Sequence, residues 1–226
     1  MNTTHYTRKN SLHFIAEIIG SALGRSSDAG LPVWLQQLGA LLGVIALSPL
    51  LLTVYVLIKW ESAGPVVFKQ VRVGKHGRTF TLYKFRSMYM ANDARYVDPA
   101  SLASDRDGVC KKYFQDPRIT RVGKFIRKYS IDELPQLWNV VRGDMVLVGP
   151  RPALPSEVAE YDFKAKRRLQ VRPGLTGLWQ VSGRANTTFE QQIALDSKYV
   201  AEKSLRMDLK ILLLTLPAVV SAKGAY

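Results

Sequence analysis

The chain has 226 residues, of which 47% are hydrophobic and 22% charged, and its 32 Lys and Arg against 18 Asp and Glu give a net charge of +14. This composition excludes a disordered, collagen-like or acidic chain, and the length suits one compact domain with an accessory segment. A single cysteine, Cys110, excludes an internal disulfide, and with only three distant histidines it excludes a structural zinc site. The positive surplus favours a polyanionic partner, which is a nucleic acid, an anionic membrane or a phosphorylated small molecule.

The first thirty residues are predicted to form a lead-in separate from the rest. Residues 11–24 carry apolar side chains at helical spacing, and the polar, glycine-containing stretch 24–30 follows them. The pattern predicts a helix lying at a membrane interface. A terminus without a fixed fold explains the same residues equally well.

An uncharged apolar segment runs from Leu38 to Ile58, close to the roughly 20 residues that cross a bilayer. Ser48-Pro49 at its centre predicts a kink or break, because Pro lacks a backbone N–H and clashes with the preceding turn. Cations dominate the C-terminal flank, so the positive-inside rule places that side in the cytoplasm. The residues alone favour a simple span over a re-entrant hairpin. Both are favoured over a buried helix of a soluble protein, because no polar face is available.

Two alternating stretches, residues 65–73 and 79–85, flank the turn residues 74–78 and predict a basic β-hairpin. Its cations continue to Arg86 and could bind phosphate oxygens, although a solvated or headgroup-facing strand pair is the alternative. The next stretch, residues 90–115, is weakly patterned and predicts a short helix followed by a loop.

Two adjacent acids, Asp132 and Glu133, stand at the start of a predicted short helix. The helix is expected to begin at Pro135 and to end before Gly143, a C-terminal cap. A helix N-terminus stabilises a carboxylate or a bound phosphate, and neighbouring cations could stabilise further charge. One acid could attack phosphorus, with a divalent metal ion offsetting the diphosphate charge. The structural alternative, which spacing alone favours, is a capping box formed by Ser130 and Glu133.

A glycine-punctuated run, residues 172–184, could cradle a nucleotide. A loop around a packed Trp179 is the commoner explanation of such a run, and neither a Walker nor a G-x-G-x-x-G signature occurs in the chain.

Taken together, five ordered motifs resemble the bacterial sugar transferase family, the monotopic phosphoglycosyl transferases, from about Val33 to the C-terminus. The motifs are residues 83–88, 116–120, 132–137, 149–152 and 172–177. The resemblance is to the catalytic unit alone, and Val146 stands where a Ser is expected. It implies transfer of a sugar 1-phosphate from a UDP-sugar, expected to be UDP-glucose or UDP-galactose, to polyprenyl (undecaprenyl) phosphate. It further implies that UMP is released and that the product starts an exopolysaccharide, O-antigen or capsule repeat unit.

The resemblance also implies roles for particular residues. Asp132 would be the nucleophile, which forms a covalent phosphosugar intermediate, and a ligand of Mg²⁺ or Mn²⁺, with Glu133 as its partner. The residues implied around the substrates are Lys84, Arg86, Arg127, Arg151, Arg184, Asp196 and Asp208. The implied partners are the UDP-sugar, the polyprenyl phosphate and an anionic lipid membrane, with no nucleic acid, and a homodimer is compatible with them.

For the fold, the resemblance favours the re-entrant reading, because Ser48-Pro49 matches a kink that returns the helix to the same face. The expected fold is a mixed α/β (α+β), monotopic domain on the cytoplasmic face of the bacterial inner membrane. It consists of a lead-in (1–30), a re-entrant membrane helix (31–60) and a mainly helical catalytic domain with the basic hairpin (61–226). Residues 211–220 are too short to span and are expected to form an interfacial helix.

Two rival functions fit the same residues. A non-enzymatic basic module bound to anionic membrane or nucleic acid would show steep salt dependence, need no divalent ion and be insensitive to Asp132→Asn. A conventional glycosyltransferase would release UDP rather than UMP.

Overall fold

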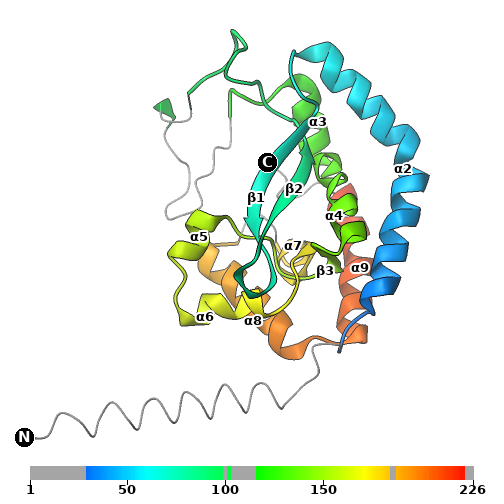
Figure 1. Cartoon of the computed structure of the whole chain (residues 1–226), viewed down its shortest axis with the longest axis vertical. Coiled ribbons are helices and arrows are strands. Elements are labelled where there is room, and N and C mark those ends of the chain that lie inside the picture. The colour runs from blue at the N-terminus through cyan, green and yellow to red at the C-terminus, as the bar shows by residue number, and fades with distance from the viewer. Residues whose placement is uncertain (1–28, 99–100, 103–115, 184–186, 222–226) are drawn as a thin grey trace, which may run out of the picture.

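The computed structural model describes residues 29–98, 101–102, 116–183 and 187–221. The predicted lead-in helix and Arg184 therefore lie outside the described residues. Helices and two small sheets make up the described fold (Figure 1), which confirms the predicted mixture of helix and strand. The elements are α2 (Val33–Glu61), β1 (Val67–Val73), η1 (Lys75–Gly77), β2 (Thr79–Phe85), α3 (Arg121–Lys128), η3 (Ile131–Glu133), α4 (Gln136–Arg142), β3 (Val146–Val148), α5 (Pro155–Ala159), α6 (Phe163–Lys166), η4 (Arg167–Gln170), β4 (Gly174–Thr176), α7 (Leu178–Val181), α8 (Phe189–Glu202) and α9 (Leu205–Val220).

The apolar segment forms one helix, α2, of 29 residues with Pro49 inside it. The helix is bent and runs along one side of the domain (Figure 1). Around the proline, the Ser48 hydroxyl donates to the carbonyl of Ile45 at 2.7 Å and the Thr53 hydroxyl to that of Pro49 at 2.9 Å. Hydroxyls that bond back to the preceding turn satisfy backbone groups where a proline disturbs a helix. The helix is long and apolar enough to cross a membrane.

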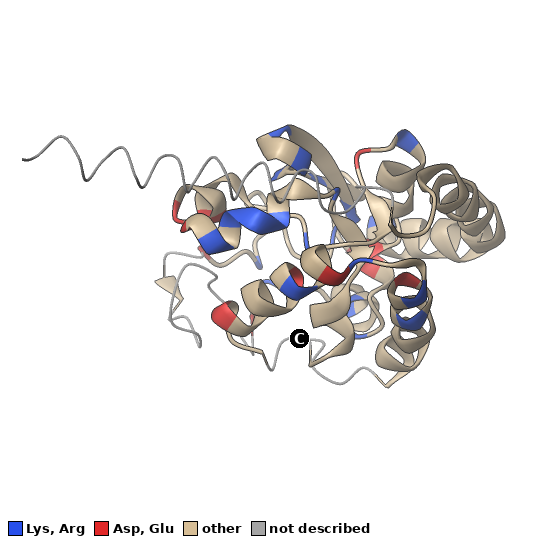
Figure 2. Ribbon diagram, turned by 90° about the horizontal axis from the view of Figure 1, so that it is seen from below, with Lys and Arg blue, Asp and Glu red and all other residues tan. Residues whose placement is uncertain are grey.

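Most of the surface of α2 faces away from the protein. Only 11% of its most apolar window is buried, which argues against a buried helix of a soluble protein. The ribbon coloured by charge shows α2 almost without charged residues, whereas the rest of the domain carries many (Figure 2). The large apolar side chains that α2 exposes are Trp34, Leu35, Leu38, Leu41, Leu42, Ile45, Leu50, Leu52, Tyr55, Val56, Leu57 and Trp60.

Two apolar clusters pack the remaining face of α2 onto the domain. The first joins it to β2 and α4 and consists of Ala40, Leu82, Leu137, Val140 and Met145. The second joins its C-terminal half to the hairpin and α3 and consists of Val54, Ile58, Val66, Phe85 and Ile126. Because burial of apolar surface is the main favourable contribution to folding, these clusters fix one face of α2 to the domain.

Two buried amide side chains add directional links between elements. Gln36 at the start of α2 donates to the carbonyl of Leu31 at 2.7 Å and accepts from the backbone N–H of Leu147 at 2.8 Å. Asn139 of α4 accepts from the N–H of Tyr83 at 3.1 Å and donates to the carbonyl of Thr81 at 2.7 Å. A buried amide costs free energy unless it is hydrogen-bonded, so these contacts specify the positions of α2 and α4.

The predicted hairpin is confirmed. Strands β1 and β2 are antiparallel, with Val67 opposite Phe85 and Val73 opposite Thr79. The turn between them places His76 at φ 57° and Gly77 at φ 79°. Because the strand pair ends at Phe85, Lys84 lies at the end of the hairpin that is away from the turn.

A second sheet brings two of the sequence motifs together. Strands β3 and β4 are parallel, with Val146 opposite Gly174 and Val148 opposite Thr176. A Cβ on Gly174 would collide with the backbone N of Gly149, so this close approach requires glycine. The run 172–184 is not a continuous loop, because its described residues contain β4 and α7, and its role as a nucleotide cradle stays a prediction.

Residues 90–98 form turns, and most of the stretch for which a short helix was predicted lies outside the described residues. The N–H of Asp93 bonds to the carbonyl of Met90 at 2.9 Å, and that of Tyr96 to the carbonyl of Asp93 at 2.9 Å. The Asp93 carboxylate also accepts from the backbone N–H of Arg95 at 3.0 Å. Local side-chain acceptors of this kind compete with helix formation, which explains the turn at residues 93–95.

The predicted helix over residues 211–220 is confirmed, and it begins earlier, as α9. Ser204 caps it by accepting from the N–H of Met207 at 3.3 Å. Asp208 and Ile211 are buried against the domain, whereas Leu213 and Leu216 are exposed. One face of α9 therefore exposes apolar side chains, and its position at a membrane interface stays a prediction.

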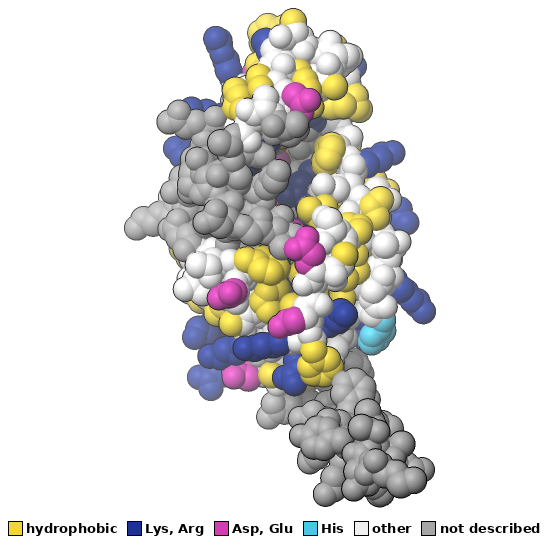
Figure 3. Space-filling model, turned by 90° about the vertical axis from the view of Figure 1, so that its left-hand side faces the viewer, with side chains coloured by type: hydrophobic (Ala, Val, Ile, Leu, Met, Phe, Trp, Pro, Cys, Tyr) yellow, Lys and Arg dark blue, Asp and Glu magenta, His cyan; other side chains and the backbone are white. Residues whose placement is uncertain are grey.

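The face opposite α2 is different in character. In the space-filling view of that face, Lys and Arg side chains gather in its lower half, where α6 lies (Figure 3). Lys164, Lys166 and Arg167 are exposed there. Part of the positive surplus of the chain is therefore a solvated surface away from α2.

Candidate active site

The acid pair lies in a tight turn between two helices. Asp132 and Glu133 belong to η3, between α3 and α4. Helix α4 begins at Gln136, one residue later than predicted, and ends at Arg142, before Gly143, whose φ of 82° is the left-handed cap conformation. The alternative of a capping box is wrong, because Ser130 has φ 54° and makes no side-chain cap bond.

Glu133 binds a lysine of the hairpin instead. Its carboxylate lies 2.6 Å from the Lys84 ammonium, and the two side chains are 33% and 25% exposed. Strand β2 supplies Lys84, and Asn139 of α4 holds the neighbouring residue Tyr83 by its backbone N–H. The position of Lys84 in the Lys84–Glu133 ion pair is therefore fixed by strand β2 and by the bond from Tyr83 to α4.

Asp132 is partly buried beside these charges. Burial raises the pKa of its carboxyl to about 6; the Lys84 ammonium lowers this pKa, the Glu133 charge raises it, and the Arg127 guanidinium lowers it. Near neutral pH the group is thus a carboxylate held among cations, and it is more basic than an exposed Asp. A raised pKa next to a specific charge partner is typical of functional carboxylates.

Arg127 reaches this position because α3 packs closely on the chain that follows β2. A Cβ on Gly123 would collide with the backbone carbonyl of Ser87, so only glycine allows the approach. The Thr120 hydroxyl caps α3 by accepting from the N–H of Gly123 at 2.8 Å. Four of the predicted site residues are therefore brought together: Lys84, Arg127, Asp132 and Glu133.

The donor set is compatible with magnesium. Within the described ranges there is no group of three or more His, Cys, Asp or Glu able to hold a metal ion. Mg²⁺, however, commonly uses one or two carboxylates together with substrate phosphates, and the adjacent Asp132 and Glu133 supply oxygen ligands of that kind. These two residues would hold such an ion when the diphosphate is present.

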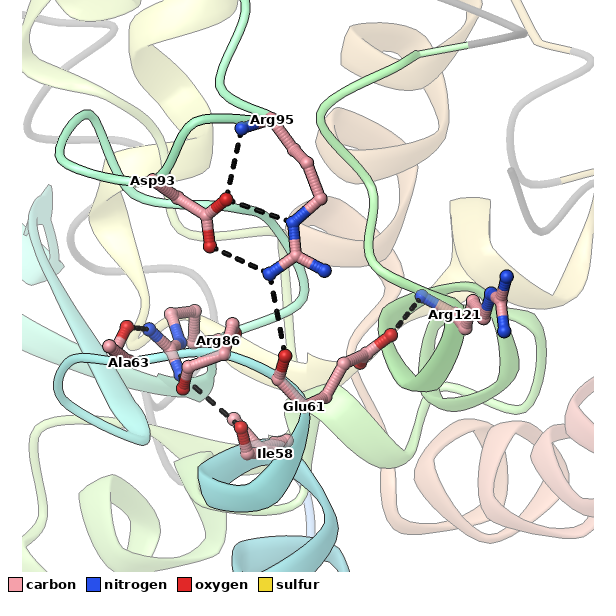
Figure 4. Close-up of polar contacts among 8 residues, drawn as sticks. Ile58, Glu61, Ala63, Arg86, Asp93, Arg95 and Arg121 are labelled. Atoms are coloured by element: carbon pink, nitrogen blue, oxygen red, sulfur yellow. Dashed lines mark hydrogen bonds and ion pairs between the residues drawn. The ribbon is translucent and has the colours of Figure 1, made fainter.

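Arg86 lies elsewhere, at the C-terminal end of α2 (Figure 4). Its side chain is buried, and its guanidinium donates to the carbonyls of Ser62, at 2.7 Å, and Ala63. Cations at a helix C-terminus satisfy carbonyls that have no partner within the helix. This geometry gives Arg86 a structural role and does not place it with Asp132.

Arg151 and Asp196 belong to a second cluster. Asp196 is fully buried and pairs with Arg168, which also donates to the backbone carbonyl of Arg151 at 3.0 Å. Burial raises the pKa of Asp196 to about 6, whereas the Arg168 charge lowers it. Asp196 therefore holds the Gly149–Pro152 motif through Arg168, while the Arg151 side chain, 35% exposed, lies 3.6 Å from Glu157.

Asp208 joins the two ends of the described chain. Its carboxylate accepts from the backbone N–H of Leu31 at 2.8 Å and lies 2.8 Å from the Tyr199 hydroxyl. That hydroxyl is also 2.9 Å from the carbonyl of Val148. A hydroxyl carries a single hydrogen, so a protonated Asp208 completes this chain of bonds best. Burial raises the pKa of Asp208, although the Leu31 N–H and the Tyr199 hydroxyl lower it.

We expect Asp208→Asn to keep the protein stable at neutral pH and to flatten its pH dependence. The folded pKa of Asp208 is raised above the unfolded value of about 3.9, so stability is full at low pH and decreases as pH rises through the folded pKa. An Asn reproduces both bonds of the protonated acid without titrating. Thermal unfolding in detergent over a pH series measures the difference.

The matched control for this change is Asp208→Ala. It leaves the Leu31 N–H and the Tyr199 hydroxyl without this partner, which costs about 1–3 kcal/mol for a buried group. An Asn variant as unstable as the Ala variant at neutral pH would contradict the protonated form.

Comparisons with known proteins identify the family of the chain. Residues 31–222 match the family described as bacterial sugar transferase. Galactosyl transferase CpsE of Streptococcus agalactiae is 45% identical over 194 residues, which are 85% of this chain and 42% of that protein. The exopolysaccharide production protein ExoY of Sinorhizobium fredii is 44% identical over 193 residues, 83% of this chain and 84% of that protein. The undecaprenyl-phosphate galactose phosphotransferase of Salmonella typhimurium is 43% identical over 188 residues, 81% of this chain and 39% of that protein.

The chain belongs to the bacterial sugar transferase family and is a transferase enzyme, which confirms the resemblance carried by the five motifs. It spans less than half the length of CpsE and of the Salmonella protein, and most of ExoY.

Proposed function

We propose that the protein is a phosphoglycosyl transferase that moves a sugar 1-phosphate from a UDP-sugar to undecaprenyl phosphate and releases UMP. The observation that carries this proposal is the Asp132 carboxylate, which lies in the turn η3 and interacts with the charges of Lys84 and Arg127, next to Glu133, which is paired to Lys84. A carboxylate nucleophile among cations suits attack on an anionic phosphorus centre.

In the proposed first step, an oxygen of Asp132 forms a bond to the phosphorus that carries the sugar. The bond from that phosphorus to the bridging oxygen breaks, and UMP leaves with the electron pair. In the second step, a phosphate oxygen of the lipid attacks the same phosphorus, and the Asp132 carboxylate is released unchanged. Lys84 and Arg127 stabilise the charge on the transferring phosphoryl oxygens in both steps. Glu133 orients Lys84 through their 2.6 Å contact.

A magnesium or manganese ion held by Asp132 and Glu133 would neutralise part of the diphosphate charge. The chain's own cations are close to the acids, and they would bind and orient the substrate phosphates through charge-assisted hydrogen bonds. Arg184, outside the described residues, and Arg151 are proposed to contact the nucleotide or phosphates.

The names of the relatives support the substrate classes. CpsE is named a galactosyl transferase, the Salmonella protein an undecaprenyl-phosphate galactose phosphotransferase, and a protein of Komagataeibacter xylinus an undecaprenyl-phosphate glucose phosphotransferase. We therefore propose UDP-galactose or UDP-glucose as donor and initiation of an exopolysaccharide, O-antigen or capsule unit as the role.

The proposal is tested with purified protein, Mg²⁺, undecaprenyl phosphate and a panel of UDP-sugars, with UMP and UDP measured separately. UMP that depends on the lipid supports phosphosugar transfer and identifies the sugar. UDP release would show conventional glycosyl transfer. Neither nucleotide, from folded protein, would favour the basic binding module.

We further propose that α2 enters the bacterial inner membrane and returns at Ser48-Pro49, with the catalytic domain on the cytoplasmic face. The exposed apolar surface of α2 and the exposed face of α9 support contact with lipid. The bend of α2 supports a path that is not a straight crossing (Figure 1).

For this topology, we expect single cysteines placed before α2 and after α9, in a chain lacking Cys110, to be protected from an impermeant thiol reagent in intact spheroplasts. Pro49→Ala is expected to expose the N-terminal cysteine, because a straight helix of 29 residues is about 43 Å long and can cross the roughly 30 Å core. Labelling of either wild-type end would show that the re-entrant path is wrong.

A further inference from the structure

The last turn of α2 is a junction between the membrane helix and the elements that carry the site cations (Figure 4). Arg86 follows strand β2 directly, and its guanidinium binds the carbonyls at the end of α2. Strand β2 carries Lys84 two residues earlier. The end of α2 therefore fixes the strand that supplies one cation of the acid pair.

Glu61, the final residue of α2, binds the other element. One carboxylate oxygen accepts from the backbone N–H of Arg121 at 2.6 Å, and the second accepts from that of Val122 at 3.0 Å. The Thr120 hydroxyl oxygen accepts a hydrogen bond from the next backbone N–H, that of Gly123. The first three backbone donors of α3 are thus all bonded, two of them by a residue 60 positions or more away along the chain.

This cap has consequences for the active site because α3 is short. It has 8 residues, and Arg127 lies in its last turn. A helix of this length has little stability of its own, so its N-terminal bonds and its packing decide its position. A negative charge at the N-terminus also favours the helix dipole. Loss of the Glu61 bonds would let the first turn fray and α3 shift, and Arg127 would shift with it.

We propose that Glu61 is a positioning residue for the transferase reaction, which holds Arg127 beside Asp132 by capping α3 from the end of the membrane helix. The inference rests on the proposed function for the reaction that is measured. The two hydrogen bonds from the backbone of α3 to Glu61 would thereby couple the position of α2 in the membrane to the position of the Arg127 charge near Asp132.

The expected effect is a loss of turnover greater than the loss of donor affinity. Small displacements of a positioned charge cost up to about 10²-fold in rate. We expect Glu61→Ala to lower kcat by roughly tenfold or more, with a smaller change in the KM for the donor. The kcat of Glu61→Gln, which retains one acceptor oxygen, is expected to lie between those of Glu61→Ala and the wild type.

The experiment is a double-mutant cycle on nucleotide release in lipid nanodiscs. Glu61→Ala is measured alone, Arg127→Ala alone, and the two together, with Arg127→Lys in place of Arg127→Ala if the latter falls to background. If Glu61 acts through Arg127, the second substitution adds little once the first is made. The matched control is Asp162→Ala, which removes a carboxylate that caps α6 by accepting from the N–H of Ala165 at 2.7 Å.

The control variant is expected to lower the unfolding temperature by a similar amount while kcat stays near that of the wild type. The inference is wrong if the effects of Glu61→Ala and Arg127→Ala multiply, or if Asp162→Ala lowers kcat as much as Glu61→Ala. The cycle is scored on whichever nucleotide the wild type releases. UDP instead of UMP would therefore overturn the proposed function alone, and multiplied effects would overturn this inference alone.

Discussion

Replacing Asp132 by Asn is expected to reduce lipid-dependent UMP release by on the order of 10³-fold or more. The amide has the shape of the acid but cannot attack phosphorus, and loss of a nucleophile typically costs at least this much. With radiolabelled donor alone, the wild type should release one UMP per enzyme molecule and retain the sugar phosphate on the protein, whereas Asp132→Asn should do neither.

The control is Glu202→Gln, which removes an exposed carboxylate at the end of α8. It should leave both readouts unchanged. Kinetics that require both substrates before any UMP appears, with no labelled wild-type protein, would contradict the covalent intermediate even if Asp132→Asn is inactive.

The second large effect is expected for Lys84→Met, with a loss of about 10²-fold in kcat. Removing a preorganised charge from a site of phosphoryl transfer costs this order of magnitude. Here the change also frees Glu133 from its 2.6 Å contact, and the pKa of Asp132 should rise, because the Lys84 ammonium lowers it. Steady-state UMP release over a range of donor concentrations separates kcat from KM.

Lys69→Met provides the comparison within the same hairpin. Lys69 is exposed on β1, so its loss removes one charge without touching the acid pair. Equal losses for the two lysines would show that the overall positive charge of the hairpin matters, and not the position of Lys84.

Local patterns in the sequence were enough for the elements that depend on neighbouring residues. Alternation and turn residues predicted the hairpin, and Pro135 and Gly143 predicted helix α4 to within one residue. The order of the five motifs indicated the family that the comparisons confirm. Four of the residues implied for the site do meet in space, because β2, α3 and η3 pack together.

Contacts between distant residues could not be read in the same way. Arg86 and Asp208 were expected near the substrates, yet their partners are carbonyls at the end of α2 and the N–H of Leu31, 177 positions away. Asn139 and Arg168 were missed, because nothing local distinguishes a polar residue that is buried and bonded from one on the surface. The only signal for Asn139 was a polar residue on the apolar side of a predicted helix.

The bond between Asp208 and the N–H of Leu31 has a consequence for biosynthesis. Helix α2 leaves the ribosome long before residue 208 is made, and at 5–20 residues per second the 177 residues between them take roughly 9 to 35 s. During that interval the amino end of α2 lacks this partner, while its apolar surface is already complete. The proposed membrane contact of α2 therefore cannot depend on Asp208 during this interval, and the bond to Leu31 forms only after α9 has been made.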